Sequence, residues 1–188
     1  MHNYYPTREE AWKLLNEFNN NTSLINHALA VESVMRYMAR KANDNEEKWG
    51  IIGLIHDLDY QQFPDQHCKK TKEILESQRW PQDYIRAVIS HGWGHCNEVK
   101  PETLLEKTLY AIDELVGFVT ACVLVRPTKS LEGLEVKSVK KKWKQKTFAA
   151  GANREVIEKG ANMLGIDLDE LIFNVIEGMK SVALKIGL

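Results

Sequence analysis

The sequence predicts an all-α domain. Residues that cap helix N-termini recur along the chain, apolar residues repeat at the helical spacing, and alternating strand-like patterns are few. At 188 residues the chain is long enough for one domain with a substantial core. Its hydrophobic fraction of 44% and charged fraction of 27% are those of an ordinary globular protein. We therefore expect residues 1–188 to form a single helical domain with almost no strand.

The N-terminal half contains five predicted helices. A capping box at Thr7–Glu10 opens the first, because the Thr oxygen can accept from a backbone amide while the Glu side chain reaches back. The apolar residues of the second, from Leu24 to Ala42, recur near a 3.6-residue period. Proline suits the first position of a helix, and one opens the fifth. The last three are expected at about 46–57, about 66–77 and from Pro81 to about Ser90.

The C-terminal half contains four more predicted helices. A long helix from Pro101 to about Val125 is apolar nearly all round, which is typical of a central, buried helix. Three shorter helices follow: a lysine-rich one within Lys137–Lys146, one that Asn153 caps and Gly165 ends, and a terminal one that Asp167 caps. We expect a core at about 22–125 and a helical extension at about 126–188.

The charge and the apolar runs of the chain argue against nucleic acid and a membrane as partners. A formal net charge of -1 gives no overall reason to bind nucleic acid, and we interpret the lysines at 137–146 as a solvated helix face. The longest apolar run, Leu115 to Val125, is too short to span a membrane. The segment from Met1 to Pro6 has no export signal, and the three cysteines form no CxxC pair. We expect reduced thiols, a cytoplasmic protein, and neither a membrane nor nucleic acid as partner.

Four ionisable residues lie in apolar surroundings. His56 and Asp57 directly follow the apolar run 49–55, and Asp113 lies in the middle of the predicted central helix. His27 lies on the apolar face of the second helix and, taken alone, is interpreted as a core histidine. Buried charges need partners, and a metal ion is one of the few that satisfies such a group of residues. Imidazole nitrogen and carboxylate oxygen together suit zinc, iron or manganese.

The order of these residues resembles the HD superfamily of metal-dependent phosphohydrolases. The pattern of that superfamily is a His, then a His-Asp pair, then an Asp, on separate helices of an all-α bundle. The resemblance covers roughly residues 26–118. It implies an HD-domain helical bundle with a helical C-terminal extension, and it implies four metal ligands: His27, His56, Asp57 and Asp113. The segment Gly53–Tyr60, with Pro64 and His67, is similar to the HDIG-related subgroup, although that subgroup has Gly at the position of Asp59.

The resemblance also implies a second metal ion. Binuclear members carry additional histidines between the His-Asp pair and the final Asp, and His67 and His91 occupy comparable places. Many of these members have adjacent histidines here, whereas this chain has Gly92 after His91, and His95 is an alternative ligand. Asp57 would bridge the two ions and orient a metal-activated hydroxide. The proton donor is left open among His67, His95 and Asp59.

The function implied is metal-dependent hydrolysis of a small phosphate ester, with nucleotides included. It would use one or two divalent transition-metal ions, either iron, manganese or zinc. One alternative is an HD-type di-iron oxygenase, because it uses a similar histidine-rich site. Another is a non-enzymatic module that binds a metal or a nucleotide. The sequence does not indicate an oligomeric state.

Overall fold

The protein is helical throughout the part that the computed structural model describes, residues 5–188. Nine α-helices and two 3-10 helices form within that range, and it contains no β-strand. The all-α prediction is confirmed. Residues 1–4, which carry most of the segment examined for an export signal, lie outside the described residues.

The helices follow one another with short connections. They are α1 (Arg8–Phe18), α2 (Thr22–Ala42), α3 (Glu46–Ile55), η1 (Pro64–Gln66), α4 (Lys69–Ser77), α5 (Gln82–Ser90), α6 (Leu104–Leu124), α7 (Val136–Trp143), α8 (Arg154–Leu164), α9 (Leu168–Met179) and η2 (Ala183–Ile186). The predicted capping box of α1 forms, and the predicted N-caps of α8 and α9 both accept hydrogen bonds from the first turn.

Two helices begin later than the sequence predicted. The fourth starts at Lys69, because the preceding proline opens a separate 3-10 turn and Cys68 adopts a φ of +65°, which no helix tolerates. The long helix α6 starts at Leu104 rather than Pro101. A second capping box explains this, because Thr103 accepts from the Glu106 amide while the Glu106 side chain accepts from the Thr103 amide.

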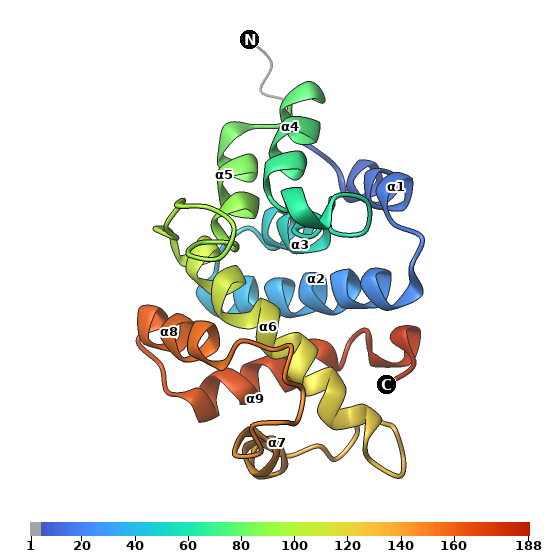
Figure 1. Ribbon diagram of the computed structural model, residues 1–188, viewed down its shortest axis with the longest axis vertical. Coiled ribbons are helices and arrows are strands. Elements are labelled where there is room, and N and C mark those ends of the chain that lie inside the picture. The colour runs from blue at the N-terminus through green and yellow to red at the C-terminus, as the bar shows by residue number, and fades with distance from the viewer. Residues whose placement is uncertain (1–4) are drawn as a thin grey trace.

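The helices form two groups on either side of α2 and α6 (Figure 1). In the view of Figure 1, α1, α3, α4 and α5 lie above α2, and α7, α8 and α9 lie below it. Helix α3 packs along α2 from one side and α9 packs along it from the other. Helix α6 is buried along most of its length, as predicted, and side chains such as Leu109, Ile112 and Phe118 are fully enclosed.

Two glycines allow the C-terminal helices to approach this centre closely. A Cβ added to Gly160 of α8 would lie 2.5 Å from the Cα of Ala111 in α6. A Cβ added to Gly178 of α9 would lie 2.8 Å from the Cα of Val34 in α2. Because any side chain would push these helices apart, glycine keeps α8 against α6 and α9 against α2.

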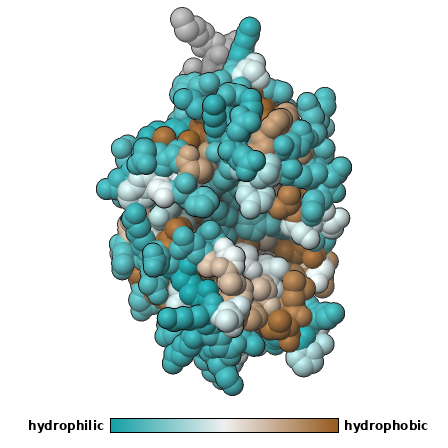
Figure 2. Space-filling view, in the orientation of Figure 1, coloured by the Kyte–Doolittle hydropathy of each residue, from teal (hydrophilic) through white to brown (hydrophobic). Residues whose placement is uncertain are grey.

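The surface is mainly hydrophilic on the face drawn in Figure 2, with a hollow near the middle, between the two groups of helices. No helix within residues 5–188 is both long and apolar enough to cross a membrane. Whether the C-terminal helices form one domain with the rest stays a prediction.

Candidate metal centre

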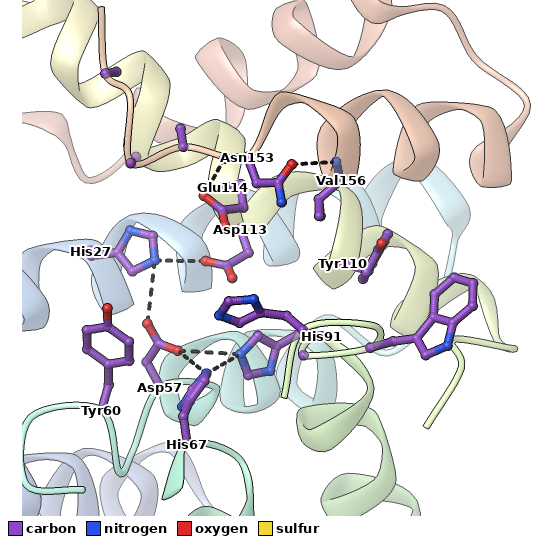
Figure 3. Close-up of a pocket in the computed structure, with 17 residues that line it drawn as sticks. His27, Asp57, Tyr60, His67, His91, Tyr110, Asp113, Glu114, Asn153 and Val156 are labelled. Carbon is purple, nitrogen blue, oxygen red and sulfur yellow. Dashed lines mark hydrogen bonds and ion pairs between the residues drawn. The ribbon is translucent and has the colours of Figure 1, made fainter. Parts of the chain in front are cut away.

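Six histidine and aspartate side chains converge between the two groups of helices, and Figure 3 labels all of them except His56. They come from five segments: His27 from α2, His56 and Asp57 from the end of α3, His67 from the turn before α4, His91 from the end of α5, and Asp113 from α6. All of them except the fully buried His56 line a cavity of about 550 Å³. The folded chain therefore brings together all six residues that the sequence analysis selected.

One set of four residues surrounds a single point. His27 Nε2 lies 2.9 Å from Asp113 Oδ1 and 4.0 Å from Asp57 Oδ2. His56 Nε2 lies 3.2 Å from Asp113 Oδ1 and 3.3 Å from Asp57 Oδ2. The four donor atoms all lie within 4.8 Å of one another. Two ligands that each bind one ion at about 2.0–2.2 Å lie at most about 4.4 Å apart, and the four pairs measured above, at 2.9–4.0 Å, meet this limit.

A second set shares Asp57 with the first. His67 Nε2 and His91 Nε2 lie 3.1 Å apart, and they lie 3.5 Å and 3.4 Å from Asp57 Oδ1. The other oxygen of this carboxylate, Oδ2, faces the first set. Asp57 therefore lies between the two sets with one oxygen toward each, as the dashed lines of Figure 3 show.

The other ring nitrogen of three histidines is held by an acceptor. His56 Nδ1 lies 2.8 Å from the Gly53 carbonyl oxygen, and His91 Nδ1 lies 2.5 Å from the Val88 carbonyl oxygen. A carbonyl oxygen can only accept, so these Nδ1 atoms carry a hydrogen and donate it. His67 Nδ1 lies 2.7 Å from the Asp59 carboxylate. In the neutral rings, each Nε2 then presents a lone pair to the centre, which is the arrangement of a metal-binding histidine.

A divalent cation would satisfy these lone pairs and the two carboxylates together. The buried His56 Nε2 has no aligned hydrogen-bond partner, although two carboxylate oxygens lie close to it. Burial by itself lowers the pKa of His56, but Asp57 and Asp113 outweigh burial and hold that pKa well above its usual value. Burial raises the pKa of Asp113, but His56 and His27 bring it well below its usual range. The site thus favours ionised carboxylates beside a positive charge, and its nitrogen and oxygen donors fit a divalent zinc, iron or manganese ion.

Asp59 lies behind this centre and orients one of its histidines. Its fully buried carboxylate accepts from His67 Nδ1 at 2.7 Å and from the Thr71 backbone N–H at 2.8 Å. Asp59 was one candidate for the proton donor from the sequence, but its side chain does not line the cavity. A carboxylate with both oxygens engaged in this way positions His67.

The remaining cavity wall is polar and aromatic. His95, the alternative ligand, lines the cavity but belongs to neither set of donor atoms. Glu114 and Asn153, which the sequence analysis did not select, line the opposite side, where Glu114 Oε2 accepts from the Asn153 backbone N–H at 3.2 Å. Tyr60 and Tyr110 add aromatic surface. The only signal for Asn153 in the sequence was its role as a helix cap, which says nothing about the cavity.

Comparison with known proteins agrees with this geometry. A protein-family model described as HD domain matches residues 24–116, a range that contains all six converging residues. The match does not test the HDIG-related subgroup, which stays a prediction. Neither the curated proteins nor the solved structures contain a match to this chain.

Proposed function

Since the chain belongs to the HD domain family through residues 24–116, we propose that it is a metal-dependent hydrolase of phosphate esters. Members of this family are mostly metal-dependent phosphohydrolases. The observation that carries the proposal is the convergence of four histidine Nε2 atoms and two carboxylates, with three of the rings fixed through Nδ1. Such a set of donors is suited to divalent cations.

We assign the two sets to two ions. His27, His56, Asp57 and Asp113 would hold the first, and Asp57, His67 and His91 would hold the second. A bound divalent ion supplies Lewis acidity, which makes a water molecule nucleophilic at neutral pH and polarises the phosphoryl group. Asp57 has one oxygen toward each set, so its carboxylate is the group that orients the attacking water between them.

The cavity wall supports a substrate with a single phosphate group. No lysine or arginine is among the described residues that line it, so the positive charge that meets the phosphate must come from the ions. A polyphosphate chain would meet no cationic side chain on this wall. Glu114 and Asn153 are suited to hydroxyl groups on the remainder of the substrate, and Tyr110 is suited to an apolar or aromatic part. Phosphate monoesters, with nucleoside monophosphates among them, fit this wall.

His95 is the residue that we assign as proton donor to the leaving group. Asp59 is buried and holds His67, and His67 presents its Nε2 to the second set. His95 is exposed, lines the cavity and lies outside both sets. Its imidazole can therefore carry a proton without competing for an ion.

The test is elemental analysis of the purified protein, followed by assays on nucleotides and other phosphate esters. We expect about two divalent ions per chain and phosphate release. Asp57→Ala should lower the metal content and reduce turnover to background. Asp65→Ala, a change to an exposed carboxylate on η1, should leave both at wild-type values.

The same assays separate the alternative functions. Iron content with oxygen consumption on a polyol or a phosphonate would indicate an oxygenase in place of a hydrolase. Bound metal without turnover of any substrate would indicate a binding module. Asp57→Ala with wild-type phosphatase activity would contradict the assignment of the centre itself.

A further inference from the structure

Two of the three cysteines lie in contact beside the second set of ligands. Cys68 directly follows His67, and Cys96 lies in the loop that follows His91. They are 28 positions apart in the chain, and their Sγ atoms lie 3.1 Å apart. No step of the proposed hydrolysis uses either thiol, so the contact calls for a separate explanation.

The local backbone is arranged to allow this contact. A Cβ added to Gly92 would lie 2.3 Å from Cys96 Sγ and 2.6 Å from Cys68 Sγ, so the two sulfur atoms occupy the space that a side chain at position 92 would need. Cys68 itself adopts a φ of +65°, a conformation that costs energy for any residue other than glycine. Such a strained conformation persists only where contacts with the surrounding structure hold the residue in it.

The two thiols differ in their access to solvent. Cys96 is exposed and lines a second cavity of about 510 Å³, which shares His67 and His95 with the catalytic cavity. Cys68 is 1% exposed and lies behind it. A small oxidant can therefore reach Cys96 from solvent, while the buried Cys68 contacts Cys96 from the protein interior. This is the arrangement of a redox-active cysteine with a resolving partner.

We propose that Cys68 and Cys96 form a reversible disulfide when the protein meets a hydroperoxide. The Cys96 sulfur attacks the terminal peroxide oxygen and forms an S–OH group as the O–O bond breaks, and the other oxygen takes the Cys96 thiol proton and leaves as water or an alcohol. The Cys68 sulfur then attacks the Cys96 sulfur to form the S–S bond, the S–O bond breaks, and the hydroxyl group leaves as water with the Cys68 thiol proton. Two thiols lose two electrons in all, and one peroxide is reduced.

The bond ties the loop after His91 to the segment that carries His67. These two imidazoles already lie side by side (Figure 3), and the disulfide would hold their backbones together independently of any ion. Any consequence of this constraint for a second ion rests on the proposed function, whereas formation of the bond does not. A failure of the hydrolase assignment would thus leave the thiol experiment unaffected.

The experiment treats the reduced, full-length protein with a small excess of hydrogen peroxide and alkylates the remaining thiols in denaturant. We expect the number of alkylated cysteines to fall from three to one, and peptide mapping to show Cys68 joined to Cys96. Dithiothreitol should restore all three. The mapping uses the wild-type chain alone, so it shows whether Cys68 and Cys96 form the disulfide even if a variant fails to fold.

Matched variants test the pairing. Cys122→Ser removes the third cysteine, which is buried and lies on α6, so this variant should still lose two thiols on oxidation. Cys96→Ser should show no internal disulfide. A wild-type protein in which peroxide oxidises Cys96 to sulfinic acid while Cys68 remains alkylatable would overturn the proposal. Retention of all three thiols under the same treatment would overturn it as well.

Discussion

Replacing Asp59 with asparagine would change which nitrogen of His67 carries the proton. The carboxylate now accepts two hydrogen bonds, from His67 Nδ1 at 2.7 Å and from the Thr71 backbone N–H at 2.8 Å. The asparagine side chain has only one acceptor, and the backbone N–H can only donate, so the asparagine oxygen must face Thr71. Its NH2 group then faces His67 Nδ1, which must accept. The ring proton moves to Nε2, and the lone pair proposed for the second ion is lost.

The size of this effect follows from the buried setting. Loss of a partner that orients a ligating histidine typically lowers metal affinity by about 10–100-fold. Asp59 is fully buried, so no water molecule from bulk solvent can take over its role. We therefore expect the affinity for the second ion to fall by about a hundredfold, the upper end of this range, which corresponds to about 2.7 kcal/mol of binding free energy. The first ion should be unaffected, because the Gly53 carbonyl oxygen, rather than Asp59, orients His56.

The assay is a metal titration of the chelator-treated protein, with elemental analysis after dialysis. Asp59→Asn should retain about one ion per chain where the wild-type protein retains about two. Asp65→Asn makes the same chemical change on the exposed η1 turn and should behave as the wild-type protein does. If Asp59→Asn bound both ions with wild-type affinity, the proposed change of the His67 tautomer would be refuted. An equal loss of both ions would refute the assignment of separate ligand sets.

Four further substitutions test the remaining assignments. Replacing His67 or His91 by alanine should lower the metal content by about one ion per chain. An unchanged metal content in both variants, measured by elemental analysis, would indicate that the wild-type site holds a single ion. His95→Gln should reduce kcat by about 10²–10⁴-fold without loss of metal, and a wild-type kcat would exclude it as the proton donor. Gly160→Ala should cost about 1–3 kcal/mol and lower Tm by about 2–12 °C in calorimetry, because its Cβ would meet the α6 backbone. Gly117→Ala is the control, because a Cβ added there would have no neighbour within 4 Å. Equal Tm values for the Gly160→Ala and Gly117→Ala variants would refute the packing argument.

The helices could be predicted because their starts and ends depend on neighbours in the chain. The Thr7 hydroxyl accepts from an amide three residues away, and Asn153 and Asp167 act over the same range. The ionisable groups of the first set could be selected for a similar reason. His56, Asp57 and Asp113 stand out because apolar residues surround them in the chain itself, and a buried charge needs a partner wherever the helices go.

Contacts between distant segments were decided only by the tertiary structure. Asp59 holds His67, Cys68 meets Cys96, and Asn153 reaches the cavity from a helix that carries no recognisable motif. No local pattern encodes such pairs, because each depends on how closely the helices approach one another. That approach depends in turn on features such as Gly160, whose missing side chain matters only once α8 lies against α6. Hydrogen bonds and close packing act over a few ångströms of space, whatever the separation of the residues along the chain.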